Sequence, residues 1–149
     1  MFSNQYMQQA YALACKANDS GEVPVGAVVV YKEKIIGAAY NQVEVAKNPL
    51  AHAEILALEQ ALAFTCTKYI EQCELYVTLE PCPMCAHAIS LAKIKRIYFG
   101  AYDEKGGGVV HGAKIYNSSS CHHHPEIISG IMEDECSRLL KNFFNNLRR

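Results

Sequence analysis

The sequence predicts a three-layer α/β/α domain with a mixed five-stranded sheet, and three observations support this fold class. Two successive stretches run from strand through helix to strand, which indicates a largely parallel, buried sheet. A β-branched run and a second strand flank a short charged turn, which predicts a hairpin. Apolar residues at a helical period near both ends of the chain predict two further helices.

Two helices and a hairpin are predicted in the first half of the chain. Asp19-Ser20-Gly21 ends the first helix, and Lys32-Glu33-Lys34 forms the hairpin turn. In order, the elements are a helix over 2–18 whose apolar positions begin with Phe2, strands over 25–31 and 35–40, a polar loop over 41–49, and a helix over 51–64.

The second half supplies the remaining strands and helices. In order, it contains a strand over 74–79, a helix over 83–92, a strand over 95–101, a glycine-rich loop over 103–108, a short edge strand over 126–129 and a helix over 132–147 with one apolar stripe. Ligand sites in such sheets lie beyond the carboxyl ends of the strands. Residues 79–82 are predicted to occupy that position.

Composition sets the broad class of the protein. A chain of 149 residues, half of them apolar and 19% charged, is expected to form one domain over residues 1–149. No apolar run approaches the roughly 20 residues that span a bilayer, and no secretory signal is evident. Seven cysteines, an odd number with two in a metal-type motif, favour free thiols and a cytoplasmic location. The five outside the motif, Cys15, Cys66, Cys73, Cys121 and Cys136, are expected to be buried small hydrophobes. The net charge of −1 provides no electrostatic case for nucleic acid.

Two short segments together predict a hydrolytic zinc site. They are His52-Ala53-Glu54 and, thirty positions later, Pro81-Cys82-Pro83-Met84-Cys85. Structural zinc sites use four Cys or His ligands, whereas only His52, Cys82 and Cys85 are obvious here. The fourth position is therefore expected to hold water. An open position beside a carboxylate favours catalysis over a structural role.

Helix geometry refines this prediction. Proline is well tolerated at the first helical position, so Pro83 places Cys82 at the N-cap and Cys85 in the first turn. The helix dipole there favours anions, and both thiols are expected to ionise readily. His52 also begins a predicted helix. Glu54 lies about 200° further around that helix, so we expect it to approach the metal from the side as a base.

These motifs resemble the signature of the zinc-dependent cytidine deaminase superfamily, His-x-Glu followed by Pro-Cys-x-x-Cys. Within it, nearly the whole chain resembles the bacterial tRNA-specific adenosine deaminases. The segments that carry the resemblance are Glu22 to Ala27, Asn41, Ala51 to Glu54, Thr78 to Cys85, Phe99 to Ala101 with Asp103 and Lys105, and Glu135 to Phe144. The zinc motif specifies only the superfamily, whereas the Asp103 segment and the last helix point to the tRNA branch.

The resemblance implies roles for six residues. His52, Cys82 and Cys85 would bind one Zn²⁺ per subunit. Glu54 would shuttle protons during catalysis. The remaining two would contact the substrate, Asn41 through a hydrogen bond to the flipped purine and Asp103 through the sugar of a neighbouring nucleotide.

The resemblance also implies a reaction and partners. The reaction is hydrolytic deamination of adenosine to inosine at the wobble position (34) of a tRNA anticodon, and the enzyme is thus a hydrolase acting on a C–N bond of a cyclic amidine. The implied partners are the tRNA anticodon stem-loop and a second copy of the chain in a homodimer, with no membrane. Lys141, Arg148 and Arg149 are candidate phosphate contacts.

Two alternatives share some of these features. A deaminase of a free base or nucleoside, of the guanine or cytosine type, would carry the same zinc motif. A non-enzymatic zinc module that binds RNA would need a fourth protein ligand, which the motifs do not supply. Gly106 to His111 departs from the small, serine-containing run of the relatives, and the histidine run 122–124 is interpreted as a solvated loop.

Overall fold

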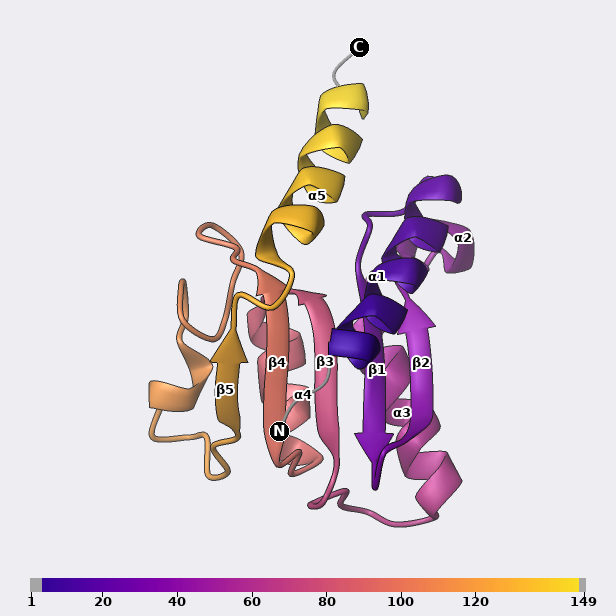
Figure 1. Cartoon of the computed structure of the whole chain (residues 1–149). Helices are drawn as coiled ribbons and strands as arrows, with labels where there is room; N and C mark the ends of the chain where they lie inside the picture. The colour runs from indigo at the N-terminus through magenta and orange to yellow at the C-terminus, as the bar shows by residue number, and fades with distance from the viewer. Residues whose placement is uncertain (1–3, 148–149) are drawn as a thin grey trace.

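The computed structural model describes residues 4–147, which fold around one five-stranded sheet in the order β2-β1-β3-β4-β5 (Figure 1). The strands are β1 (Gly26–Tyr31), β2 (Lys34–Tyr40), β3 (Glu74–Leu79), β4 (Arg96–Ala101) and β5 (Glu126–Ser129). The helices are α1 (Asn4–Asp19), α2 (Val43–Ala46), α3 (Ala53–Thr65), α4 (Pro83–Leu91) and α5 (Glu133–Leu147), with a 3₁₀ turn at Ile115–Asn117.

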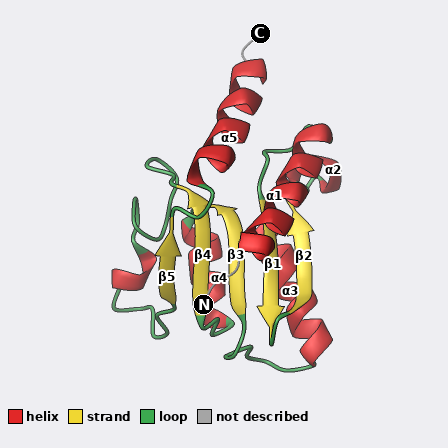
Figure 2. Cartoon of the chain, in the orientation of Figure 1, coloured by secondary structure: helices red, strands yellow, loops and turns green. Residues whose placement is uncertain are grey.

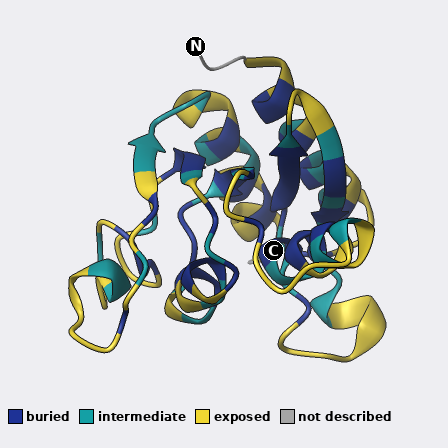
Figure 3. Ribbon diagram, turned by 90° about the horizontal axis from the view of Figure 1, so that it is seen from below, coloured by how far each residue is buried: buried dark blue, intermediate teal, exposed yellow. Residues whose placement is uncertain are grey.

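Helices cover both faces of this sheet, so the predicted three-layer architecture is confirmed. α1 and α5 lie on one face, and α3 and α4 lie on the other (Figure 2). Buried residues concentrate in the sheet between the two helical layers (Figure 3). On one face of the sheet the core is mainly aliphatic, whereas the face under α1 carries Tyr6, Tyr76 and Tyr98.

The sheet is less parallel than the strand and helix alternation suggested. β3, β4 and β5 are parallel neighbours, but β1 pairs antiparallel with both β2 and β3. The hairpin makes β1 antiparallel to β2, and β1 rather than β2 is the strand that pairs with β3. The connection through α3 therefore crosses over β1, and β2 and β3 run in the same direction without pairing.

Two further predictions are revised. The segment 41–49 is not entirely loop, because it contains the one-turn helix α2. Cys66, expected to be a buried small hydrophobe, is exposed at the left-handed C-cap of α3, although Cys73, Cys121 and Cys136 are buried. The predicted start at Phe2 and the candidate contacts Arg148 and Arg149 lie outside the described residues.

The hairpin turn consists of two charged residues in the left-handed backbone conformation. Lys32 and Glu33 both adopt positive φ, 48° and 65°, which is the requirement of a two-residue type I′ turn. This turn lies at the lower end of the sheet in Figure 1, opposite the carboxyl ends of β3 and β4. Within residues 4–147, no helix has the length and apolarity that crossing a membrane requires.

Candidate metal centre

Two helix N-termini bring the predicted ligands together behind the carboxyl end of β3. His52 is the N-cap residue of α3, and Cys82 is the N-cap residue of α4 with Pro83 at the first helical position. Cys85 lies in the first turn of α4, as the sequence predicts. One nitrogen of His52 and the two Cys sulfurs all lie within 4.8 Å of one another.

The spacing of these three atoms suits a tetrahedral zinc ion. Nδ1 of His52 lies 3.6 Å from Sγ of Cys82 and 3.5 Å from Sγ of Cys85. Zinc bonds of about 2.05 Å to nitrogen and 2.3 Å to sulfur at a tetrahedral angle separate the two ligand atoms by about 3.6 Å. The donor set, one imidazole and two thiols, is also one that zinc prefers. Among the described residues, no fourth His, Cys, Asp or Glu joins this group.

Asn41 holds the helix that carries His52. The side chain of His52 does not cap α3, and Oδ1 of Asn41 instead accepts a hydrogen bond of 2.8 Å from the N–H of Ala53. A second bond of 3.1 Å, from the N–H of Asn41 to the carbonyl of Val25, ties the residue to the start of β1. The amide oxygen of Asn41 is therefore occupied, which leaves its NH₂ group for a ligand.

The two thiols differ in their acidity. A hydrogen bond from Cys85 lowers the pKa of Cys82 to about 4. Burial acts in the opposite direction, and a second hydrogen bond, from His52, helps to outweigh it. The pKa of Cys85 is raised, because its thiol donates to Cys82 and is buried. Of the two thiols expected to ionise readily, only Cys82 has a lowered pKa. A bound cation would favour the thiolate form of both.

Glu54 is a buried carboxyl group beside the thiols, with only 4% of its surface exposed. Burial is the main cause that raises its pKa to about 7, and the Cys82 thiolate adds to the increase. The pKa of His52 is also raised, first by its hydrogen bond with Cys82, with Glu54 contributing. A carboxyl group that titrates near neutral pH is suited to accept and return a proton.

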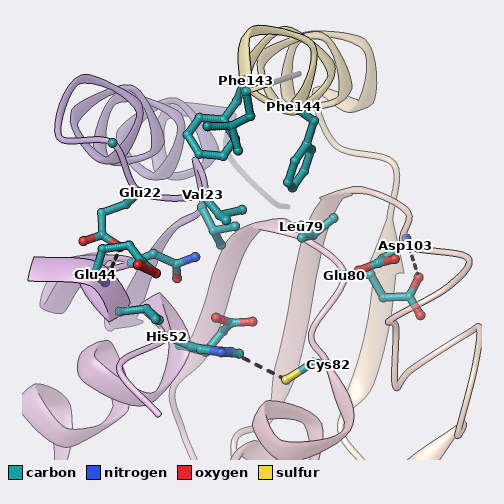
Figure 4. A pocket seen from close by; sticks show the side chains of 16 residues that line it. Glu22, Val23, Glu44, His52, Leu79, Glu80, Cys82, Asp103, Phe143 and Phe144 are labelled. Carbon is teal, nitrogen blue, oxygen red and sulfur yellow. Dashed lines mark hydrogen bonds between the residues drawn. The ribbon is translucent and has the colours of Figure 1, made fainter. Parts of the chain in front are cut away.

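A cavity of about 590 Å³ opens beside these groups (Figure 4). His52 and Cys82 lie on its floor, and Phe143 and Phe144 of α5 hang over it from the opposite side. Five of the six predicted site residues line it. The sixth, Cys85, is fully buried and does not reach the cavity surface. The lining residues named in the site prediction are Asn41, His52, Glu54, Cys82 and Asp103. Its volume lies in the range of small-ligand sites.

Asp103 contributes to the wall of this cavity through a turn. Its Oδ1 accepts a hydrogen bond of 2.8 Å from the N–H of Gly106. The residue is half-buried, and it is one of the side chains that line the cavity (Figure 4). Asp103 therefore has a structural function in the loop in addition to the substrate contact that the resemblance implies.

Two buried carboxylates that the sequence analysis gave no role organise the cavity walls. Glu80 accepts hydrogen bonds from the N–H groups of Asp103, Val109, Val110 and His111, and pairs with the imidazole of His111 at 2.9 Å. Burial alone would raise the pKa of Glu80, but these hydrogen bonds outweigh it, with His111 foremost, and the pKa is lowered. Glu80 thereby fixes the loop over residues 103–111.

Glu22 performs the same function on the opposite wall. Its two carboxylate oxygens accept the N–H groups of Glu44 at 3.0 Å and Val45 at 2.8 Å, which caps the N-terminus of α2. Only 1% of Glu22 is exposed. The sequence offered one signal for both residues, since a glutamate beside a buried strand needs several hydrogen-bond donors.

The glycines of the 103–111 loop are required by close approach. A Cβ on Gly108 would lie 2.6 Å from the nitrogen of Pro83, and one on Gly107 would lie 2.6 Å from Oε2 of Glu80. The loop thus packs directly on the start of α4. This contact fixes the backbone between Cys82 and Pro83.

Comparison with known proteins identifies the family. The model of the MafB19-like deaminase family matches residues 1–148. The tRNA-specific adenosine deaminase of Rickettsia typhi is 45% identical over 144 residues, covering 95% of this chain and 97% of the relative. This chain belongs to the tRNA-specific adenosine deaminase family.

Solved structures agree with this assignment. A structure from a study of A-to-I editing by tRNA:A34 deaminases has a TM-score of 0.91 and 39% identity, covering 93% of this chain and all of the other. A guanine deaminase of Nitrosomonas europaea shares the fold alone, with a TM-score of 0.81 at 21% identity. These matches confirm two predictions from the sequence, the cytidine-deaminase-like fold and the assignment to the deaminase enzymes.

Proposed function

We propose that the protein is a zinc-dependent deaminase that converts adenosine to inosine at the wobble position (34) of a tRNA anticodon. The observation that carries the proposal is the 590 Å³ cavity, which is lined by the buried carboxyl group of Glu54 and by two of the three clustered zinc ligands, His52 and Cys82. The names of the relatives supply the substrate. An adenine stacked in a duplex cannot enter such a cavity, so an unpaired anticodon loop suits it.

His52, Cys82 and Cys85 would hold the metal. Bound there, zinc would lower the pKa of a water on its open side from about 16 to near 7, which makes hydroxide available at neutral pH. The absence of a fourth ligand among the described residues leaves that side to solvent and substrate. This donor set argues against the alternative of a purely structural zinc module, which would have four protein ligands.

Glu54 would move the protons of the reaction. It would take a proton from the attacking water and deliver it to N1 of the adenine ring, which makes C6 more electrophilic. Oxygen then adds to C6. Glu54 would next take the proton of the new C6–OH group and pass it to the exocyclic nitrogen. The C6–N bond would then break, which releases ammonia and leaves the C6=O of inosine. One carboxyl group serves both transfers because its proton is returned in each cycle.

Asn41 and Asp103 would position the substrate. Because Oδ1 of Asn41 caps α3, its NH₂ group is the part that would donate to an acceptor atom of the purine. Asp103 would accept a hydrogen bond from the sugar of a neighbouring nucleotide. Asn41 follows β2 and Asp103 follows β4, and both line the same cavity as Glu54.

Substitution of Glu54 tests the catalytic assignment. Glu54→Gln should bind as much zinc as the unchanged protein and lose most turnover, because glutamine cannot carry the proton. Metal content is measured by elemental analysis, and ammonia release is measured with an anticodon stem-loop. Normal turnover by Glu54→Gln would exclude the role given to Glu54.

The substrate class is tested with four compounds offered separately. We expect ammonia from an anticodon stem-loop with adenosine at position 34, and none from adenosine, guanine or cytidine. Release from free guanine without release from the stem-loop would favour the free-base alternative. Zinc bound without ammonia from any of the four would favour the non-enzymatic module.

The protein would act as a homodimer, with α3 and α4 as the shared face. An apolar groove of about 300 Å³ runs between them, lined by Ile55, Leu58, Leu62 and Leu91 among others. Leu91, at 66% exposed, extends the apolar surface of this groove, and a continuous apolar patch is typical of a protein interface. Leu91→Glu should convert the dimer to a monomer in analytical ultracentrifugation, whereas Val45→Glu, on exposed α2, should not.

A further inference from the structure

Three aromatic rings line one cavity at the end of the sheet opposite the metal centre. Tyr31 ends β1, Phe64 lies in the last turn of α3, and Tyr69 lies in the loop between α3 and β3. All three face a cavity of about 500 Å³. Phe64 is 56% exposed and Tyr69 is 38% exposed, so ring surface is open to solvent. The segments that carry them meet at the lower end of the molecule in Figure 1.

A lysine lies over each of these rings. The ammonium of Lys32 is 5.2 Å from the centre of Tyr31, and that of Lys34 is 5.0 Å from the centre of Phe64. Tyr69 has two such neighbours, Lys68 at 5.3 Å and Lys93 at 4.2 Å. Such contacts occur roughly once per 70–80 residues, so about two are expected in a chain of this length. Four at one end therefore mark a distinct surface, which we name the lysine–aromatic pole.

The charge of this pole departs from that of the whole chain, whose net charge is −1. Lys95 joins the four lysines through a neighbouring cavity that Glu71 and Lys93 also line. Two other glutamates at this end, Glu74 and Glu126, form ion pairs with Arg96, so their charge is already compensated. Glu33 of the hairpin turn and Glu71 of the cavity wall offset part of the positive charge, but the five lysines outnumber them.

We propose that the lysine–aromatic pole binds single-stranded RNA. An unpaired base would stack on Tyr69 or Phe64 inside the cavity, and the lysines that lie over the rings would turn to the flanking phosphates. Aromatic platforms between cations are the combination that single-stranded nucleic acids recognise without sequence preference. Thr67, whose hydroxyl bonds to Thr65 and to the carbonyl of Tyr69, holds the loop that presents the ring.

Other occupants fit the pole less well. A second copy of the chain would bring two positively charged poles together, which is unfavourable. An acidic peptide would pair with the lysines but leave the rings without a stacking partner. The pole is remote from the catalytic cavity and shares no lining residue with it, so this proposal does not depend on the proposed reaction.

Binding of a labelled ten-nucleotide oligouridylate tests the proposal, because this RNA contains no adenine for the catalytic site. Fluorescence anisotropy with the unchanged full chain should show saturable binding. The double variant Lys34→Glu/Lys68→Glu should weaken it at least tenfold. It should also reduce the slope of log K against log salt by about 0.7 for each phosphate that the variant no longer neutralises. Lys114→Glu, at an exposed position outside the pole, should change neither by more than twofold.

The rings are tested by a matched pair. Tyr69→Phe should keep the affinity, whereas Tyr69→Leu should lower it about fivefold or more, because leucine has no π-face. Thermal unfolding confirms that each variant is folded. Equal affinity of Tyr69→Leu and Tyr69→Phe, or equal losses for Lys114→Glu and the double lysine variant, would overturn the proposal. Self-association that depends on Tyr69, without RNA binding, would overturn it in favour of a protein interface.

Discussion

The carboxylate of Glu80 lies 2.9 Å from Nδ1 of His111. Glu80 is only 1% exposed, so this pair joins a buried acidic group to a half-buried imidazole. Four backbone N–H groups of the 103–111 loop donate to the same carboxylate. A buried charge is tolerated when its hydrogen-bonding capacity is filled in this way. The wall of the cavity that contains Asp103 therefore depends on one ionised side chain at the end of β3.

Replacing Glu80 by glutamine should reduce stability in a pH-dependent manner. The folded-state pKa of Glu80 is lowered below its unfolded value near 4.3. Its stabilisation is thus complete above about pH 4.3 and is lost as the pH falls through the folded-state pKa. We expect Glu80→Gln to lose about 2–3 kcal/mol of unfolding free energy at pH 7, since hydrogen bonds to a charged group are removed.

Urea unfolding of both proteins from pH 7 to pH 3 measures this difference, which should shrink at the acid end. His111→Asn provides the control, because it removes the imidazole but leaves the four N–H donors in place, and it should cost less than Glu80→Gln. A difference between the unchanged protein and Glu80→Gln that stays constant across this pH range would contradict the role of the charge.

Loss of the Glu22 carboxylate should loosen α2. Glu22 accepts the N–H groups of Glu44 and Val45, which have no intrahelical acceptor at the start of a one-turn helix. Glu22→Ala should cost about 1–2 kcal/mol, the range of a lost helix cap. Amide hydrogen exchange should accelerate at Glu44 and Val45 and remain unchanged at Ala53, whose acceptor is Asn41. Equal acceleration at all three amides would indicate general unfolding instead.

Much of the fold can be predicted because periodicity and turn residues are local signals. The strand over 74–79, the edge strand over 126–129 and the helix that begins with Pro83 lie within a residue or two of their predicted bounds. The metal ligands can be located for a similar reason, since a ligand at a helix N-terminus leaves a pattern of adjacent proline, cysteine and apolar residues.

The carboxylates that build the cavity walls cannot be predicted in this way. Glu22 and Glu80 bind backbone groups more than twenty positions away, and a backbone N–H has no signature in the sequence. The antiparallel pairing of β1 with β3 is also a contact between distant segments. Local sequence patterns do not determine which strand pairs with β3. The sequence indicates a solvated His123, yet its imidazole bonds to the carbonyl of Ile94 at 2.7 Å. Each of these features is a pairing between distant segments.

Phe143 and Phe144 should separate stability from substrate binding. Both rings line the cavity and contact each other, but Phe143 is 9% exposed and Phe144 is 43% exposed. Phe143→Ala should lower the unfolding free energy by about 3 kcal/mol, because a buried ring leaves a void.

Phe144→Ala should cost less than about 1 kcal/mol and should weaken stem-loop binding at least about fivefold, because an exposed ring can stack on a base. Chemical denaturation and anisotropy with the anticodon stem-loop distinguish the two effects. Unchanged binding by Phe144→Ala would assign both rings to packing alone.

Asn41 should show two separable roles, because its two polar atoms serve different partners. Oδ1 caps α3 through the N–H of Ala53, and in the proposed reaction the NH₂ group would donate to the purine. Asn41→Asp keeps the acceptor that caps α3 and removes the donor. Its melting temperature should therefore stay near that of the unchanged protein. Its kcat/KM on the stem-loop should fall about tenfold or more, which corresponds to the loss of one hydrogen bond. Asn41→Ala should lose both properties. Glu54→Gln serves as the reference for a loss of catalysis at constant fold. Retained turnover in Asn41→Asp, together with a lower melting temperature in Asn41→Ala, would reduce Asn41 to the cap of α3.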